Sequence, residues 1–206
     1  MIKFDKDFKF NILNIENYKS SKKMVFLKNF FKKNRKLKGD YFEFGVYQGR
    51  SLISVALLFK ELGIKKKVYG FDSFGGFPNY SKFDNFENFF EMFKKKKISK
   101  KHYQDILNFK KIKNFINKSN NLNQKLLPKN ISSSNNFSDT SIKYLKKKIN
   151  FLNLNNIILI KGDFNKTVTK FFKNNPDKKV LLANLDCDLY DSYTCALNEI
   201  WPKLVK

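Results

Sequence analysis

Glycines and carboxylates follow four short apolar stretches of this chain. In chain order they are Gly45 and Gly49, then Asp72, then Asp163, and finally Asp186 with Asp188. Glycine has no side chain, so a ligand can touch the backbone beside it. A carboxylate next to such a turn can accept hydrogen bonds from both hydroxyl groups of a ribose. Glycines at one strand end and an acid at the next therefore predict a nucleoside-binding site.

The first of these groups lies between an expected strand and an expected helix. Tyr41 to Val46 is mostly aromatic and aliphatic, and the apolar run that opens after Ser51 fits a buried helix over about residues 50–62. Such a turn aims the amides of the helix N-terminus at an anion. Glu43 stands two residues before the first glycine, which gives Glu-x-Gly-x-x-x-Gly instead of the Gly-x-Gly-x-x-Gly of dinucleotide folds. On this block alone, an ordinary tight turn is an equally good interpretation.

The remaining groups also lie at the ends of expected strands. Strands are predicted at about 67–72, 157–161 and 180–185, with helices between them. This alternation predicts an α/β fold with a Rossmann-like, doubly wound parallel sheet. Ligands bind such sheets at the carboxyl ends of the strands, where all these polar groups are expected to meet.

Length and composition limit the class of protein. The 206 residues and 42% hydrophobic content predict one globular domain spanning residues 1–206. No apolar run approaches the roughly 20 residues of a membrane span. The N-terminus lacks the apolar core of a signal peptide. We therefore expect a cytoplasmic protein without membrane contact, in which Cys187 and Cys195 are small buried residues.

The net charge of +24 has two interpretations. A basic surface attracts polyanions such as RNA. Alternatively, the heavy use of Lys, Asn, Phe, Ile and Tyr reflects codons rich in A and T, and the lysines are scattered along the chain. The compositional interpretation is favoured, which makes nucleic acid the less favoured class of partner.

Two segments lie outside the strand and helix units. The lead, residues 1–38, contains an amphipathic helix expected at 17–37. Residues 79–137 form a lysine- and asparagine-rich insertion that is interpreted equally well as a lid over a substrate or as a surface insertion. Within it, residues 117–136 read as a loop. His102 is interpreted as a surface residue in preference to a general base.

Taken together, the strand-end groups resemble those of the macrocin O-methyltransferase type of class I S-adenosylmethionine-dependent methyltransferases. The matching blocks are Glu43–Ser51, Tyr69–Pro78, Ile160–Phe164, and Leu185–Tyr190 with Ser192. The first block is also similar to that of catechol O-methyltransferase, Glu-x-Gly-x-Tyr-x-Gly-x-Ser. The resemblance implies a class I methyltransferase fold and S-adenosyl-L-methionine as the cofactor.

The resemblance also implies roles for individual residues. Glu43, Gly45, Tyr47 and Gly49 would line the methionine end of the cofactor, Ser51 would bind its carboxylate, Asp72 would hold the ribose beside Ser73, and Asp163 with Phe164 would lie near the adenine. Asp186 would be the catalytic residue that faces the methyl group, and with Asp188 it would bind Mg²⁺. A hard cation there would lower the pKa of an acceptor hydroxyl and orient it.

The implied activity is metal-assisted O-methylation of a small-molecule hydroxyl, with a sugar in glycan or secondary-metabolite synthesis as the acceptor. The alternatives are a basic RNA methyltransferase or RNA-binding domain, and a cofactor-binding remnant without activity. The relatives continue after the region of residues 201–204 into a glycine turn and a fifth strand with further acids, whereas this chain stops at Lys206. We therefore expect a fragment that lacks the C-terminal strands and part of the metal site. Association into a homo-oligomer stays open.

Overall fold

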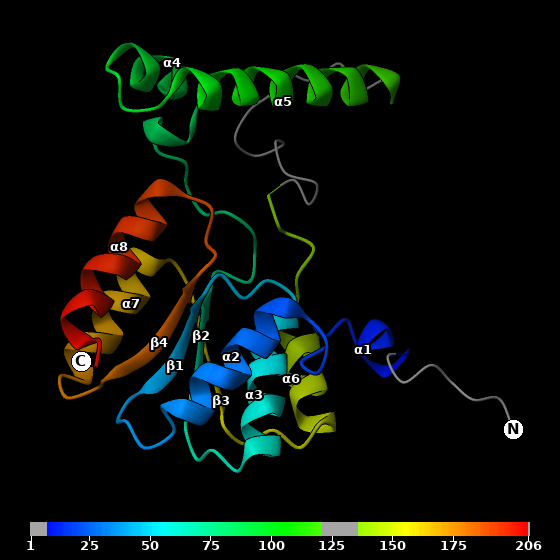
Figure 1. Ribbon diagram of the computed structural model, residues 1–206, viewed down its shortest axis with the longest axis vertical. Helices are drawn as coiled ribbons and strands as arrows, with labels where there is room; N and C mark the ends of the chain where they lie inside the picture. Colours follow the sequence, from blue (N-terminus) through cyan, green and yellow to red (C-terminus); the bar gives the residue numbers. More distant parts are fainter. Residues whose placement is uncertain (1–7, 121–135, 206) are drawn as a thin grey trace, which may run out of the picture. The chain divides into compact units, whose positions relative to one another are not determined.

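A single parallel sheet organises the described part of the chain. The computed structural model describes residues 8–120 and 136–205. Its strands are β1 (Asp40–Phe44), β2 (Val68–Asp72), β3 (Ile157–Lys161) and β4 (Val180–Leu185), in the order β3-β2-β1-β4 with every pair parallel (Figure 1). The predicted α/β architecture with a parallel sheet is therefore confirmed.

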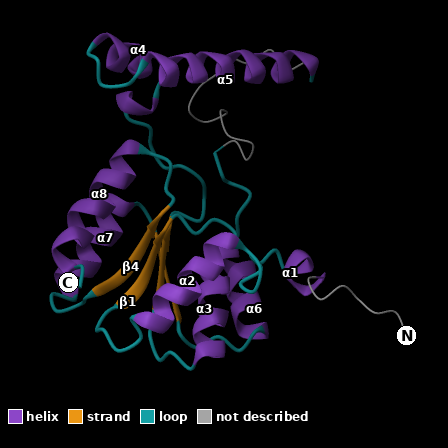
Figure 2. Cartoon of the chain, viewed as in Figure 1, coloured by secondary structure: helices purple, strands orange, loops and turns teal. Residues whose placement is uncertain are grey.

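Helices cover both faces of this sheet (Figure 2). One face carries α2 (Lys22–Lys33), α3 (Arg50–Leu62) and α6 (Ile142–Phe151), and the other carries α7 (Phe164–Asn174) and α8 (Tyr190–Ile200). The short helices α1 (Phe8–Ile12) and η3 (Trp201–Lys203) lie near the two ends of the described chain. The two central strands, β1 and β2, are buried almost throughout, which explains why their residues are mostly apolar.

Alternation along β1 divides the apolar core into two clusters. Tyr41 packs into the cluster with α2, α3 and α6, whereas Phe42 and Phe44 pack into the cluster with α7 and α8. Successive strand residues point to opposite faces, so Glu43 shares the face of Tyr41. Aromatic stacking ties neighbouring strands together, and the rings of Phe42 and Tyr69 lie 4.7 Å apart.

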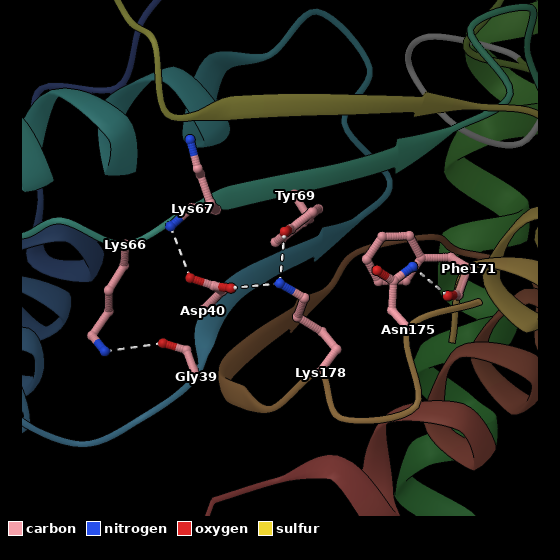
Figure 3. A network of polar contacts seen from close by, with 8 residues as sticks. All are labelled: Gly39, Asp40, Lys66, Lys67, Tyr69, Phe171, Asn175 and Lys178. Carbon is pink, nitrogen blue, oxygen red and sulfur yellow. Dashed lines mark hydrogen bonds and ion pairs between the residues drawn. The ribbon is translucent and has the colours of Figure 1, made fainter. Parts of the chain in front are cut away.

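A polar network joins the amino-terminal ends of β1, β2 and β4 (Figure 3). The Lys178 ammonium lies 3.3 Å from an Asp40 carboxylate oxygen and donates to the Tyr69 hydroxyl at 3.0 Å. The other Asp40 oxygen accepts from the Lys67 amide at 2.8 Å, and the Lys66 ammonium donates to the Gly39 carbonyl at 3.0 Å. The network aligns the strand starts, so it fixes the edge opposite to the predicted ligand site.

The described chain divides into two compact units. The first contains residues 8–75, 140–188 and 192–205 and holds the sheet, and the second contains residues 76–120, 136–139 and 189–191. The prediction of one domain with an insertion at 79–137 stays a prediction.

The second unit contains η1 (Lys82–Asp84), α4 (Phe86–Lys94) and α5 (Lys100–Ser119). Ser81 and Asp84 form a capping box at η1, and the Phe93 ring stacks on Tyr103 with 4.8 Å between centroids.

The insertion is more helical than expected. Residues 117–119 were predicted to lie in a loop but continue α5, because the polar residues of this stretch are compatible with a solvent-exposed helix. Most of the predicted loop, residues 121–135, lies outside the described residues. His102 is an exposed residue of α5, in agreement with the favoured interpretation.

Within residues 8–120 and 136–205, no helix combines the length and the apolar character needed to cross a membrane.

Candidate functional site

The polar groups predicted at the strand ends meet along one edge of the sheet. Gly45 donates its amide to the Phe71 carbonyl at 2.9 Å, which continues the pairing of β1 with β2. Likewise, the Gly162 amide donates to the Asp72 carbonyl and the Asp186 amide donates to the Phe44 carbonyl. The expectation that the four strand ends share one edge is therefore confirmed.

The glycine turn between β1 and α3 has a left-handed backbone at three of five successive positions. The φ angles are +89° at Gly45, +52° at Tyr47 and +80° at Gly49. A left-handed residue other than glycine costs about 1–2 kcal/mol, so Tyr47 is held there by its surroundings. Residues strained in this way concentrate at functional sites, and Phe74 and Asp188 on the neighbouring strand-end loops also have positive φ.

Gly45 brings the glycine turn against the end of β4. A Cβ atom at this position would lie 1.9 Å from the carbonyl oxygen of Asp186, which is far inside van der Waals contact. Only glycine permits this approach. The same absence of a side chain places the turn against the main chain of Asp186 and Cys187, at the start of the loop that follows β4.

Asp72 holds the glycine turn from the side of β2. Its Oδ2 accepts hydrogen bonds from the amides of Val46 at 2.7 Å and Tyr47 at 2.8 Å, and its Oδ1 accepts from the Phe74 amide at 2.6 Å. The predicted position beside the turn is correct, but these hydrogen bonds were not foreseen. Because Oδ1 accepts one of these bonds and a carboxylate oxygen has two lone pairs, Oδ1 can still accept from a hydroxyl group.

Glu43 lies in the core beneath the turn. Its side chain is fully buried, and it accepts hydrogen bonds from the Tyr41 hydroxyl and the Ser51 hydroxyl, each at 2.7 Å. Burial raises the pKa of Glu43 to about 7, although these two hydrogen bonds oppose the shift. Ser51, in the first turn of α3, is thereby tied to the core of the site.

The residues after β3 are fixed by the start of α7. Asp163 is the N-cap of this helix, and its Oδ1 accepts from the Asn165 amide at 2.9 Å. The Phe164 ring is buried and meets the Phe44 ring edge-on at 5.8 Å, so this ring belongs to the core. After β2, Ser73 accepts a hydrogen bond from the Gly75 amide at 3.2 Å.

The loop after β4 presents two exposed carboxylates, Asp186 and Asp188. Partial desolvation and the negative charge of Asp186 raise the pKa of Asp188. Cys187 between them is buried, and burial raises the pKa of its thiol to about 12. Within the described residues, no group of three or more Cys, His, Asp or Glu side chains is gathered to hold a metal ion. A pair of carboxylates still suits Mg²⁺, which keeps several water ligands and commonly takes only one or two carboxylates.

Two residues at this edge were missed by the sequence reasoning. Lys148 is buried at the end of α6 and donates to a carbonyl of the glycine turn, and so does the hydroxyl of Thr140. The pattern did contain a signal, because Lys148 lies at helical spacing between the apolar residues Leu145 and Ile149. A lysine on the buried face of a helix requires an acceptor in the interior.

Comparison with known proteins supports the fold. No family model matches the chain, and no curated protein matches it in sequence. Among solved structures, the calicheamicin methyltransferase CalS11 matches with a TM-score of 0.58 and 19% identity, over 98% of this chain and 69% of CalS11. The O-methyltransferase NovP matches with a TM-score of 0.54 and 17% identity, over 88% of this chain and 61% of NovP. An apo structure of CalS11, described as a TDP-rhamnose 3'-O-methyltransferase, gives a TM-score of 0.47. The first two matches show that the chain has a fold found in methyltransferases.

Proposed function

We propose that this chain is an S-adenosylmethionine-dependent O-methyltransferase that acts on a hydroxyl group of a small molecule. The observation that carries the proposal is the edge at which a glycine turn, held by Asp72, lies against the loop bearing Asp186 and Asp188. The methyltransferase fold supports the same reading. A sugar is the proposed acceptor, because the strand-end blocks resemble those of the macrocin O-methyltransferase type.

The glycine turn and its neighbours would bind the cofactor. Gly45, Tyr47 and Gly49 would border its methionine end, where the N-terminus of α3 offers a positive dipole to a carboxylate and has no acidic residue in its first turn. Ser51 would add a polar group there, and Glu43 would orient Ser51 by accepting a hydrogen bond from its hydroxyl.

The neighbouring strand ends would bind the nucleoside. The remaining lone pair of Asp72 Oδ1 would accept from the ribose, with Ser73 nearby. The backbone at Asp163 and Phe164 would border the adenine, because the Phe164 ring is occupied in the core.

The carboxylates after β4 would prepare the acceptor. When bound, S-adenosylmethionine supplies an electrophilic methyl group, and Mg²⁺ would lower the pKa of the acceptor hydroxyl. Asp186 and Asp188 would hold that cation and orient the hydroxyl oxygen. Desolvation and, after it, repulsion by Asp186 raise the pKa of Asp188, and a bound cation would relieve that repulsion.

Calorimetric titration with S-adenosylhomocysteine tests the cofactor site. Asp72→Ala should weaken binding at least tenfold, because it removes the acceptor and releases the turn. Asp177→Ala is the matched control, since Asp177 is an exposed aspartate between α7 and β4, at the opposite edge of the sheet. Equal heats for the wild-type chain and the Asp72 variant would refute the assignment.

Transfer of a labelled methyl group identifies the acceptor class. The wild-type chain is incubated with labelled S-adenosylmethionine and Mg²⁺, and with either sugars and sugar nucleotides or total RNA. Label in the sugar fraction is expected. The net charge of +24 motivates the RNA arm, and label confined to RNA would favour the alternative methyltransferase.

A further inference from the structure

α6 packs directly against the glycine turn. A Cβ atom at Gly49 would lie 2.4 Å from Cδ1 of Leu145, so this glycine permits close contact with α6. Just before α6, the Thr140 hydroxyl donates to the Tyr47 carbonyl at 2.7 Å. The turn therefore contacts α6 and the residue just before it through Gly49 and the Tyr47 carbonyl, while the Asp72 carboxylate binds its amides.

Lys148 supplies the second contact between α6 and the turn. Its side chain is 5% exposed, and its ammonium donates to the Gln48 carbonyl at 3.1 Å and to the Leu13 carbonyl at 3.0 Å. Burial lowers the pKa of this ammonium. None of the ion pairs among the described residues includes Lys148, and its ammonium is surrounded by the two carbonyls and by the Tyr144 ring, whose centroid lies 5.9 Å away.

The N-terminal lead completes the junction. The Asn14 side chain donates to the Gln48 side chain at 2.7 Å, and the Glu16 amide donates to the Arg50 carbonyl at 3.2 Å. The Ser54 hydroxyl contacts the carbonyls of both Glu16 and Arg50. The residues just after α1 therefore lie against the turn, and the Lys148 ammonium is shared between them.

The choice of lysine at this position calls for a role beyond packing. Removing an ammonium from water is unfavourable, and a methionine or leucine would fill the same space without that cost. What a lysine adds is a donor that reaches two carbonyls from segments far apart in the chain. Two successive carbonyls of the turn are thus both bound, that of Tyr47 by Thr140 just before α6 and that of Gln48 by Lys148 of α6.

We propose that Lys148 is a positioning residue that, with Thr140, holds the glycine turn in the conformation that receives the cofactor. The consequence for binding rests on the proposed function, whereas the effect on the turn does not. Two of its carbonyls are bound by Thr140 and Lys148, and two of its amides are bound by Asp72, so the turn is organised before any ligand arrives. Such preorganisation reduces the ordering cost of binding.

Hydrogen exchange of the ligand-free chain, followed by mass spectrometry, tests this role. Lys148→Met keeps an unbranched side chain that is one heavy atom shorter and removes the ammonium, and Thr140→Val removes the second donor. Each variant should speed exchange in residues 45–51 at least tenfold, while exchange in α7 stays unchanged. The matched control is Ile149→Ala, because Ile149 is a buried neighbour on α6 that donates no side-chain hydrogen bond.

Three outcomes decide the matter. Faster amide exchange in residues 45–51 of the Lys148 and Thr140 variants, without such an increase in Ile149→Ala, supports the positioning role. Unchanged exchange in residues 45–51, or equal acceleration in all three variants, overturns it and leaves only a packing role. In titrations with S-adenosylhomocysteine, Lys148→Met should weaken binding about tenfold while Ile149→Ala does not. If the wild-type chain bound no cofactor analogue, the proposed function alone would fall, because the exchange comparison uses no ligand.

Discussion

Replacing Gly45 by alanine tests the close approach of the glycine turn to β4. The φ angle of Gly45 is +89°, and the added Cβ would lie 1.9 Å from the Asp186 carbonyl oxygen. Two free-energy costs therefore add. One is the strain of an alanine with a left-handed backbone, and the other is the displacement of the Asp186 main chain from the glycine turn. Gly63→Ala is a matched control, because Gly63 has φ +62° and no atom within 4 Å of its Cβ position.

The two substitutions should differ by the cost of the steric conflict. Left-handed backbone costs alanine about 1–2 kcal/mol, which both variants bear. Forcing extra atoms into a packed site costs about 1–3 kcal/mol more, which only Gly45→Ala bears. We expect the free energy of unfolding to fall by about 2 kcal/mol more in Gly45→Ala than in Gly63→Ala.

Urea unfolding followed by circular dichroism measures this difference. With an m-value of about 2 kcal/mol per molar urea, the midpoint of Gly45→Ala should lie about 1 M below that of Gly63→Ala. The same variant should also lose binding of S-adenosylhomocysteine, whereas Gly63→Ala should retain it. Equal midpoints for the two variants would show that the turn and the end of β4 are not in contact, and the site would lose its main support.

Three further outcomes are expected. The raised pKa of Glu43 means that the folded chain holds this proton more tightly than the unfolded chain, so stability should fall by about 3 kcal/mol as the pH rises from about 4.5 to about 7. Glu43→Gln, which cannot ionise, should remove that fall from urea midpoints measured across this range, and an unaltered pH profile would count against the buried acid. Asp40→Asn should cost only about 1 kcal/mol in urea unfolding, because its ion pair with Lys178 is partly exposed, and a loss above about 3 kcal/mol would contradict this. Cys195 is only partly buried, contrary to the expectation from the sequence, so a thiol reagent should modify it in the folded chain. The same reagent should modify Cys187 only after unfolding, since Cys187 is buried with a pKa of about 12, and two rapidly reacting thiols would contradict the burial of Cys187.

Much of the sheet could be predicted because its strands are short apolar runs ended by polar residues. The predicted strands at 157–161 and 180–185 coincide with β3 and β4, and the helix at about 50–62 coincides with α3. The position of Asp72 beside the glycine turn followed from the general geometry of parallel sheets. Periodicity and chain order thus sufficed to place the polar groups on one edge.

The contacts within that edge could not be predicted, because they depend on directions of side chains and peptide groups. Asp72 binds amides of the turn, and Phe164 turns its ring into the core, although the sequence only places both near a ligand. The burial of Glu43 was not predicted, although Glu43 shares a strand face with Tyr41, whose hydroxyl donates to it. Lys148 lay within a run of three lysines that resembles a solvated surface.

The pairing order of the sheet also bears on how the chain folds. Phe44 meets Phe71 within the first part of the chain, but its other neighbour, Leu185, is synthesised far later. Thr140 and Lys148, which donate to the glycine turn, are also synthesised long after the turn itself. The central strand therefore waits for distant partners, and closing such long loops slows folding. During translation the glycine turn should therefore lack a fixed conformation until β4 has been synthesised. Until then, the apolar faces of α2 and α3 should be incompletely covered and accessible to chaperones.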